Sequence, residues 1–192
     1  MAHTPSSMLP LGTKAPQFRL PDTEGKMRSL EEFKNAKGYL VMFICNHCPF
    51  VIHVRPAIIT LAREFQEKGF AVIAIASNDI KAYPQDGPAA MKEEALRHGF
   101  TFPYVFDETQ DVAKAYQAAC TPDFYLFDAR QVLVYRGQMD DSRPSNNKPN
   151  DGKDLRLAME SVLAGKTPPR DQKPSMGCNI KWKPGNEPEY YG

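Results

Sequence analysis

The stretch ICNHCPF, residues 44–50, carries the strongest fold signal in this sequence. The residues before it, 39–44, form a continuous apolar run without polar alternation, which is typical of a central strand covered on both faces. After Cys48, apolar residues recur at helical spacing as far as residue 65, and Lys68 and Gly69 then supply a stop signal. Two cysteines with two residues between them are therefore predicted at the junction of a buried strand and a helix N-terminus.

The pattern on both sides of this stretch predicts an α/β fold with a mixed central sheet flanked by helices. Residues 70–76 are predicted to be a second buried strand, so that residues 39–76 form a β-α-β unit with a right-handed crossover. A turn-rich segment at residues 21–25 predicts an N-terminal hairpin. Further elements are expected as helices at residues 88–98, 111–119 and 154–163, and as strands at residues 102–106, 124–127 and 132–135, the last two forming an antiparallel hairpin.

We expect one domain over residues 1–165, followed by a tail over residues 166–192 that packs on it. A chain of 192 residues of which 42% are hydrophobic has the size of one ordinary domain. The tail is rich in proline and glycine and shows neither helical nor strand periodicity, so its structure is predicted to be irregular. It also contains Trp182 and Tyr190, whose apolar surface is costly to leave in water, and this favours docking over disorder.

The charge balance argues against nucleic acids and membrane surfaces as partners. Lys and Arg number 24 against 23 Asp and Glu, which leaves no excess charge to hold phosphates or anionic lipids. The sequence also contains no signal-peptide pattern and no apolar run of the ~18 residues that a membrane span needs. We therefore expect a soluble protein of the cytoplasm. In that reducing compartment a close cysteine pair indicates redox chemistry or metal binding rather than a structural disulfide.

The predicted position of Cys45 and Cys48 favours thiol-disulfide exchange. Free backbone N–H groups and the dipole at a helix N-terminus stabilise a thiolate, which is the nucleophile of that reaction. Cys45 precedes the helix, so we expect it to be the more exposed cysteine, to have a pKa below the ordinary value, and to attack. Cys48, which is more shielded, is expected to resolve the mixed disulfide. His47 is a candidate for tuning Cys45 electrostatically, with a merely solvated side chain as the alternative.

A metal site is the competing interpretation of the same stretch. Four soft or borderline ligands lie within nine residues, namely Cys45, His47, Cys48 and His53. A zinc site usually takes a second pair of ligands from elsewhere, but the sequence has no second CxxC or HxxxH, so that only His98 or a tail residue remains. We therefore expect neither a resident metal nor another cofactor. A non-enzymatic metal-binding or copper-delivery protein is the second alternative function, and burial of both cysteines in the core is the structural alternative.

Three separated motifs give the sequence a resemblance to a known family. They are CNHCPF at residues 45–50, CTPDF at residues 120–124 and GCNIKWKPG at residues 177–185. In this order they resemble the peroxiredoxin-like proteins of the thioredoxin superfamily, the AhpC/TSA-type redoxins, over nearly the whole chain. The resemblance implies a thioredoxin-like fold and redox activity of the CxxC pair on a protein or small-molecule disulfide, with an electron-donating thiol system as the second partner.

The resemblance also implies a role for Thr121 and Pro122. Pro122 would be a cis-proline facing the CxxC pair, and the backbone of Thr121 would form a short strand-like contact with a bound substrate. Without the family pattern, Pro122 would be predicted to be an ordinary strand-entry proline, because only ~5% of X-Pro bonds are cis. The chain departs from thioredoxins proper in having Ile44 and Tyr39 where they have a Trp and a buried Asp. Proton transfer to and from Cys48 therefore needs another group or water.

A thiol-dependent peroxidase with an antioxidant role is the first alternative function. Peroxiredoxins resembling this chain place a Thr three residues before the peroxidatic cysteine and an Arg just before a late strand. Here the first place holds Met42 if Cys45 is taken as that cysteine and Cys45 if Cys48 is, and the second place holds the pair Thr121-Pro122. A hydroperoxide would therefore find fewer donors to polarise its O–O bond, and peroxidase activity ranks behind dithiol-disulfide exchange.

Cys120 and Cys178 are the remaining cysteines, and a buried structural role is the default for such single residues. If the tail docks, it decides where Cys178 points. Cys178 then pairs with Cys120, or it serves as a third redox cysteine that passes electrons to or from the CxxC pair. The sequence does not indicate the oligomeric state.

Overall fold

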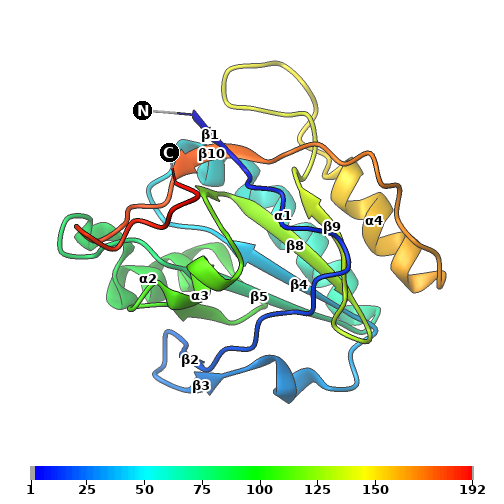
Figure 1. The fold of residues 1–192 in the computed structure, drawn as a ribbon, viewed down its shortest axis with the longest axis horizontal. Coiled ribbons are helices and arrows are strands. Elements are labelled where there is room, and N and C mark those ends of the chain that lie inside the picture. Colours follow the sequence, from blue (N-terminus) through cyan, green and yellow to red (C-terminus); the bar gives the residue numbers. More distant parts are fainter. Residues whose placement is uncertain (1–2, 192) are drawn as a thin grey trace.

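The centre of the molecule is a five-stranded mixed sheet with the strand order β6-β5-β4-β8-β9 (Figure 1). The computed structural model describes residues 3–191. The strands are β4 (Gly38–Phe43), β5 (Phe70–Ala76), β6 (Tyr104–Phe106), β8 (Asp123–Asp128) and β9 (Leu133–Gly137). β4 pairs parallel with β5 and antiparallel with β8, β6 is parallel to β5, and β9 is antiparallel to β8. The predicted mixed sheet and its late hairpin are confirmed.

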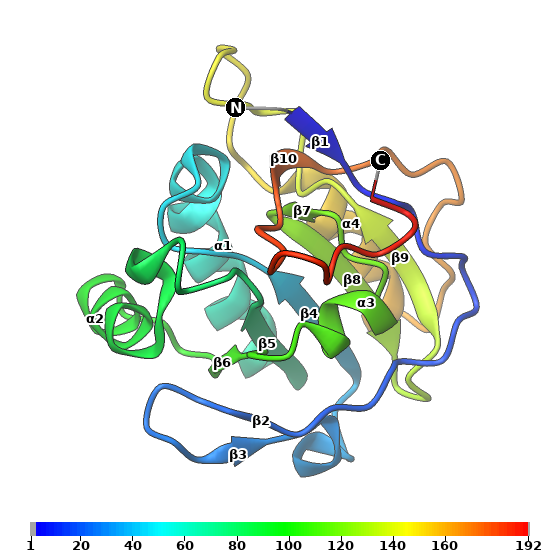
Figure 2. The same cartoon turned by 60° about the vertical axis from the view of Figure 1, so that its left-hand side comes forward.

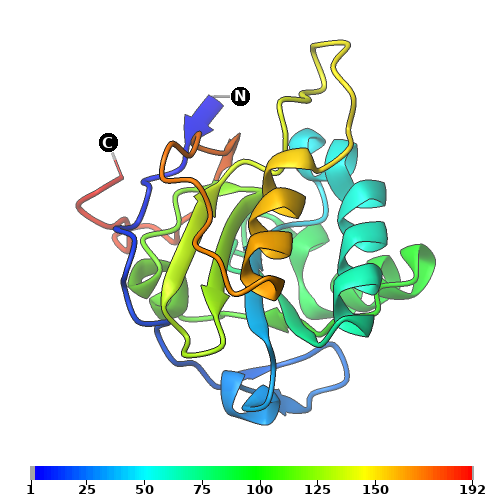
Figure 3. The same cartoon turned by 90° about the vertical axis from the view of Figure 1, so that its right-hand side faces the viewer.

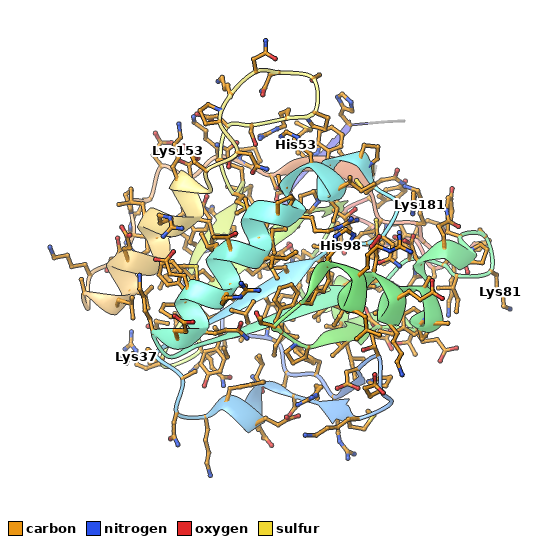
Figure 4. The ribbon with its side chains drawn as sticks, turned by 180° about the vertical axis from the view of Figure 1, so that it is seen from behind. Lys37, His53, Lys81, His98, Lys153 and Lys181 are labelled. Atoms are coloured by element: carbon orange, nitrogen blue, oxygen red, sulfur yellow. The ribbon has the colours of Figure 1, made fainter. Side chains whose placement is uncertain are left out.

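Both faces of this sheet are covered. Alternate residues of β4 point to opposite sides, and all six are buried. Leu40 and Met42 share one hydrophobic cluster with side chains of the three longer helices. These are α1 (Pro49–Glu67), α2 (Pro88–His98) and α4 (Lys153–Leu163), which lie on one side of the sheet in Figure 4. Val41 and Phe43 belong to a second cluster on the opposite side, which the short helix α3 (Asp111–Ala115) covers in part. Within residues 3–191, no helix combines the length and the apolar character that crossing a membrane requires.

The helix that follows the CxxC motif forms as predicted. Its buried apolar face consists of Val51, Val54, Ile58, Leu61, Ala62 and Phe65. Pro49 occupies the first helical position, where its missing N–H costs nothing. At the other end Gly69 has a φ of +100°, which a glycine adopts without strain, and the chain turns there into β5.

Helix α3 is shorter than the predicted range of residues 111–119, since it ends after five residues. Gln117 takes a positive φ of 51°, which an α-helix does not allow. The neighbouring Tyr116 is fully buried and packs against Phe43 and Tyr125, with 5.5 Å between ring centroids in both pairs. Tertiary packing of this aromatic ring therefore overrides the local helical pattern.

The predicted N-terminal hairpin is present as β2 (Leu20–Pro21) and β3 (Met27–Arg28). Asp22 stabilises its turn, because its carboxylate accepts the N–H groups of Glu24 and Lys26. Two short 3-10 helices were not predicted. They are η1 (Leu30–Phe33), after the hairpin, and η2 (Pro84–Asp86), before α2.

The tail contains a strand, so the prediction of an irregular tail is wrong in this part. β10 (Met176–Asn179) is the middle strand of a second sheet, between β1 (His3–Pro5) and β7 (Cys120–Thr121) (Figure 2). Four residues are too few to show an alternating pattern, and β10 forms because it pairs on both sides. Gly177 allows the close approach, since a Cβ there would lie 1.9 Å from the carbonyl oxygen of Thr121.

Beyond β10, the tail packs on the face of the main sheet opposite α1 and α4 (Figure 3). Ile180 and Trp182 are buried in the second hydrophobic cluster, and Tyr190 packs against it. The backbone is held as well: Lys181 accepts the N–H of Asp79 at 2.8 Å. Apolar burial and backbone hydrogen bonds together dock the tail on the rest of the chain.

Candidate active site

The two cysteines of the CxxC motif lie next to the C-terminal end of β4, in the middle of the main sheet. Cys45 follows β4 by two residues, and Cys48 is the N-cap residue of α1. Ile44 continues the sheet up to the motif, because its N–H bonds to the carbonyl of Ile75 at 3.0 Å. Both residues are buried, as the structural alternative expected, and Cys45 is hardly more exposed than Cys48, at 2% against 0%. The predicted strand-helix junction is therefore confirmed.

Thr121 lies across both sulfur atoms of the pair. Its hydroxyl Oγ1 is 3.4 Å from Cys45 Sγ, and its carbonyl oxygen is 3.3 Å from Cys48 Sγ. The peptide bond between Thr121 and Pro122 is cis, as the resemblance implies. Strand β7 thus brings Thr121, predicted to bind substrate, into contact with both cysteines. Its backbone pairs with Cys178 of β10, so the strand-like contact with a substrate that the resemblance implies is already made by the chain's own tail. Direct contact between Pro122 and the pair stays a prediction.

Cys178, in strand β10 of the C-terminal tail, contacts Cys48 of the pair. Its Sγ lies 2.8 Å from Cys48 Sγ, and β10 carries it there in register with Thr121 of β7. The Sγ atom of Cys120 instead lies 3.8 Å from the carbonyl oxygen of Pro122. Among the residues that the structure describes, all four cysteines are free, so no bond joins Cys120 to Cys178. The sulfur atoms of Cys45, Cys48 and Cys178 form one cluster.

The two thiols of the CxxC motif have opposite pKa shifts. The pKa of Cys48 is lowered to about 5, first because the Cys45 thiol donates a hydrogen bond to its thiolate. The Cys178 thiol and the Val51 N–H add to this effect. The pKa of Cys45 is raised well above its ordinary value by the same hydrogen bond, by burial and by the charge of Asp86. The prediction of a lowered pKa for Cys45 is wrong, because the helix N-terminus serves Cys48 instead.

Asp86, the last residue of η2, is a site residue that the sequence does not reveal. It is fully buried and accepts the Asn46 N–H at 2.8 Å and the Asn78 side-chain N–H at 2.8 Å. His47 Nδ1 lies 2.6 Å from its carboxylate. These partners satisfy a charge that burial would otherwise make costly. Asp86 is thus a buried carboxylate of the site, but it lies beside Cys45 and so does not take the place of the Asp that is missing at Tyr39.

His47 is held in place and is not merely solvated. Besides its bond to Asp86, its ring stacks on Tyr83, with centroids 5.4 Å apart and an interplanar angle of 8°. The ammonium group of Lys181, from the tail, lies 5.6 Å from the centroid of the Tyr83 ring. The solvated alternative is therefore wrong. A ring nitrogen of His47 lies within 4.8 Å of Cys45 Sγ, so that His47 can act on Cys45 directly as well as through Asp86.

Three donor atoms of the site lie close enough to hold one metal ion. Cys45 Sγ, a ring nitrogen of His47 and a carboxylate oxygen of Asp86 are all within 4.8 Å of one another. A set of sulfur, nitrogen and oxygen donors suits zinc or a similar transition metal. The same carboxylate oxygen of Asp86 already bonds His47 and Asn78, so a metal would have to replace existing hydrogen bonds.

The other two histidines considered as metal ligands, His53 and His98, bind other side chains. His53 Nε2 is 3.2 Å from the hydroxyl of Ser142. His98, labelled in Figure 4, lies where α2 meets α1, with Nε2 2.9 Å from Arg55 and 3.0 Å from Glu94. Neither residue belongs to the group of three donors around Asp86.

Asp123, next to Pro122, is a buried carboxyl group at the edge of the site. It accepts hydrogen bonds from the hydroxyls of Ser6 and Tyr125. Burial raises its pKa from 3.8 to about 7. An acid whose pKa is higher in the folded protein contributes stability below its unfolded pKa, and this contribution is lost as the pH rises through the folded value.

We expect Asp123→Asn to remove part of the pH dependence of stability. Between pH 4 and pH 7 the free energy of unfolding of the wild type should fall relative to that of the variant, by up to about 4 kcal/mol. Urea unfolding of both proteins at several pH values measures this difference. The exposed Asp171 provides the control Asp171→Asn, which should follow the wild type. Parallel curves for wild type and Asp123→Asn would contradict the raised pKa.

Two sequence comparisons relate this chain to known proteins. The model of the AhpC/TSA family matches residues 11–136, a range that contains the CxxC pair, Thr121 and Pro122. The chain is also 26% identical over 125 residues to the thiol-disulfide oxidoreductase ResA of Bacillus thuringiensis subsp. konkukian. That alignment covers 65% of this chain and 68% of the relative.

Solved structures extend the similarity to the fold. An uncharacterized conserved protein from Geobacillus kaustophilus superimposes with a TM-score of 0.94 at 50% identity, over 96% of this chain and 98% of that chain. The thioredoxin domain of a thiol-disulfide oxidoreductase from Bacteroides vulgatus superimposes with a TM-score of 0.58 at 24% identity, over 69% of this chain and 91% of that domain. The fold is thus thioredoxin-like. Because the family model spans the main sheet and both cysteines of the motif, this chain belongs to the AhpC/TSA family.

Proposed function

We propose that this protein is a thiol-disulfide oxidoreductase whose Cys45 and Cys48 cycle between a dithiol and a disulfide. The observation that carries the proposal is the buried thiol pair, in which the pKa of Cys48 is lowered to about 5 and that of Cys45 is raised. Such a pair carries one negative charge and keeps one proton throughout the physiological pH range. Thiolate is therefore always available for disulfide exchange. The relative from Bacillus thuringiensis bears the name of this activity.

In the first step Cys45 attacks a disulfide of the substrate. Both residues are buried, and this role rests on the place of Cys45 before the helix, whereas Cys48 is its N-cap residue. The Cys48 thiolate accepts the Cys45 proton through their hydrogen bond as the attack proceeds. The Cys45 sulfur bonds to one substrate sulfur, and the other substrate sulfur leaves as a thiolate that takes a proton from water.

In the second step Cys48 resolves the mixed disulfide. The Val51 N–H and the Cys178 thiol still favour the thiolate form, so Cys48 can lose its proton again. Its sulfur attacks the Cys45 sulfur, and the second substrate sulfur leaves. The substrate ends as a dithiol and the enzyme as a Cys45–Cys48 disulfide. A thiol system that donates electrons reduces this disulfide by the reverse exchange.

Thr121, Pro122 and His47 are proposed to bind and orient the substrate. Thr121 supports this role by its contacts with both sulfur atoms. His47 borders an open pocket of about 210 Å³, whose other polar side chains are Asn46, Gln85, Glu93, Glu94 and Arg97. Such a rim suits a protein segment or a small charged disulfide. We place the protein in the cytoplasm, where reducing conditions would make the dithiol the resting form.

Cys48→Ser is expected to trap the substrate on Cys45 as a stable mixed disulfide, because serine cannot resolve it. After incubation with insulin, mass spectrometry without reduction should find one insulin chain attached to the tryptic peptide of residues 38–63. Cys45→Ser is the matched variant and should form no adduct. An adduct on Cys48 in Cys45→Ser, with none in Cys48→Ser, would reverse the two roles and assign the attack to the cysteine with the lower pKa.

A thiol peroxidase is the second candidate function, favoured by the family and by the Thr121 hydroxyl 3.4 Å from Cys45 Sγ. The guanidinium of Arg55 is engaged, because it donates to the Asn46 carbonyl at 3.2 Å and pairs with Glu94 at 3.4 Å. Together with the contact of Nη1 with His98 at 2.9 Å, these contacts occupy part of its five N–H groups and leave fewer for a peroxide oxygen, which weakens an antioxidant role. Hydrogen peroxide consumption with the same donor thiol separates the candidates: a rate above that of disulfide reduction would put the peroxidase first.

A further inference from the structure

We propose that Cys178 is a third redox cysteine, which attacks Cys48 of the Cys45–Cys48 disulfide and converts it into a Cys48–Cys178 disulfide. The proposal rests on the dithiol-disulfide cycle proposed above and adds a step to it. Oxidising equivalents that arrive at Cys45 would pass through Cys48 to the tail. Cys45 would then react with the substrate, whereas the electron donor would reduce the Cys48–Cys178 disulfide.

The distance between the sulfur atoms carries this inference. Cys178 Sγ lies 2.8 Å from Cys48 Sγ, and a disulfide bond measures about 2.05 Å, so that a shift of under about 1 Å closes it. Cys48 is also the partner of Cys45, whose thiol donates to it. Cys48 is thus the central sulfur of the cluster, and it can bond to either neighbour but not to both.

The fold holds Cys178 in this position from both sides. In β10, Cys178 is in register with His3 of β1 and with Thr121 of β7. Farther along, the Lys181 N–H donates to the Asn78 side chain at 2.9 Å, and Asn78 in turn bonds Asp86. The tail is therefore tied to the carboxylate that adjoins Cys45. Cys178 is only 3% exposed, which leaves the neighbouring Cys48 as its nearest redox partner.

The exchange balances without an outside oxidant. The Cys178 sulfur forms a bond to the Cys48 sulfur as the bond between Cys48 and Cys45 breaks, and Cys45 leaves with the electron pair. The proton lost by Cys178 ends on Cys45, so the numbers of disulfides and of bound protons are unchanged. The product is an oxidised enzyme with a free Cys45 thiol.

Peptide mapping of Cys45→Ser tests the bond directly. Trypsin places Cys48, Cys120 and Cys178 in separate peptides, residues 38–63, 115–130 and 171–181. After mild oxidation with diamide and alkylation, we expect more than half of the protein to contain 38–63 linked to 171–181, with 115–130 alkylated. Cys48→Ser, which keeps Cys45 and Cys178, should not form this link. A link that is absent from Cys45→Ser, or equally abundant in both variants, overturns the proposal.

Two rates test the role of Cys178 and the proposed function separately, namely the reduction of the oxidised enzyme by dithiothreitol and the reduction of insulin. Cys178→Ser keeps a hydrogen-bond donor near Cys48 but cannot form the second disulfide, so its oxidised form stays entirely as Cys45–Cys48. Its rate of reduction by dithiothreitol should therefore differ from that of the wild type by at least about 5-fold. Cys178→Ala must behave in the same way. If both variants recycle at the wild-type rate while the wild type reduces insulin, the relay is wrong and the proposed function stands. If the wild type reduces no insulin, both are wrong.

Discussion

Insulin reduction is expected to fall by at least about 10³-fold in Cys45→Ser, to the rate that the reductant alone sustains, because this variant lacks the attacking sulfur. Cys48 cannot replace it, since its side chain has no exposed surface and is enclosed by Cys45, Thr121 and Cys178. The turbidity of reduced insulin with dithiothreitol as donor measures the rate. Cys120→Ala is the control and should stay within about twofold of the wild type, because Cys120 contacts the Pro122 carbonyl and no sulfur. More than a tenth of the wild-type rate in Cys45→Ser would contradict the assignment.

The pH profile of the wild type sharpens this prediction. With the pKa of Cys48 at about 5, the reduced pair already carries its charge at pH 6. The single-turnover rate of prereduced enzyme with insulin should therefore be nearly flat from pH 6 to pH 8. An ordinary thiol with a pKa of about 8.5 would lose about tenfold for each unit below it. A tenfold fall per unit in this range would show that the pair lacks a lowered pKa.

Gly177→Ala is expected to detach β10 from β7 and to have the largest effect on stability. A Cβ at this position would lie 1.9 Å from the carbonyl oxygen of Thr121, and backbone atoms cannot move aside as a flexible side chain can. Overpacking commonly costs ~1–3 kcal/mol, and we expect about 3 kcal/mol or more here because the strand pairing is lost too. Urea unfolding gives the free energy, and hydrogen exchange of residues 171–191 reports the docking of the tail.

Gly185→Ala is the matched control in the same tail. A Cβ on Gly185 meets nothing within 4 Å, and only the positive φ of 78° opposes it, at about 1 kcal/mol. This variant should keep slow exchange in β10. Gly177→Ala should also lose the link between Cys48 and Cys178 on mild oxidation, because β10 no longer holds Cys178 in place. Slow exchange of residues 176–179 in Gly177→Ala would contradict the expected clash.

The local part of the site could be predicted from the sequence alone. The apolar run at 39–44, the spacing of Cys45 and Cys48, and the helical pattern after Pro49 place the motif at a strand-helix junction, which the structure has. These signals work because strand burial and helix periodicity depend on neighbours a few residues away. The cis bond before Pro122 follows from the family resemblance, which reflects the same fold.

Which thiol ionises first was decided by tertiary structure. The helix N-terminus does stabilise a thiolate, but the N-cap residue is Cys48. The carboxylate of Asp86 lies beside Cys45 and bonds the N–H of Asn46, which is 40 residues away in the chain. Nothing in the segment around residue 86 shows where that carboxylate will lie. Long-range electrostatics of this kind depends on how η2 folds back over the motif.

The third sulfur was also placed by the fold. Cys178 is 130 residues from Cys48, and it arrives there because β10 pairs with β1 and β7 at the same time. A four-residue strand has no pattern of its own and forms only where both edges are present. The sequence alone determined the CxxC pair and its surrounding elements, through local periodicity. The tertiary structure alone decided the three-sulfur cluster and its charge distribution, because backbone pairing and burial join segments that no local signal connects.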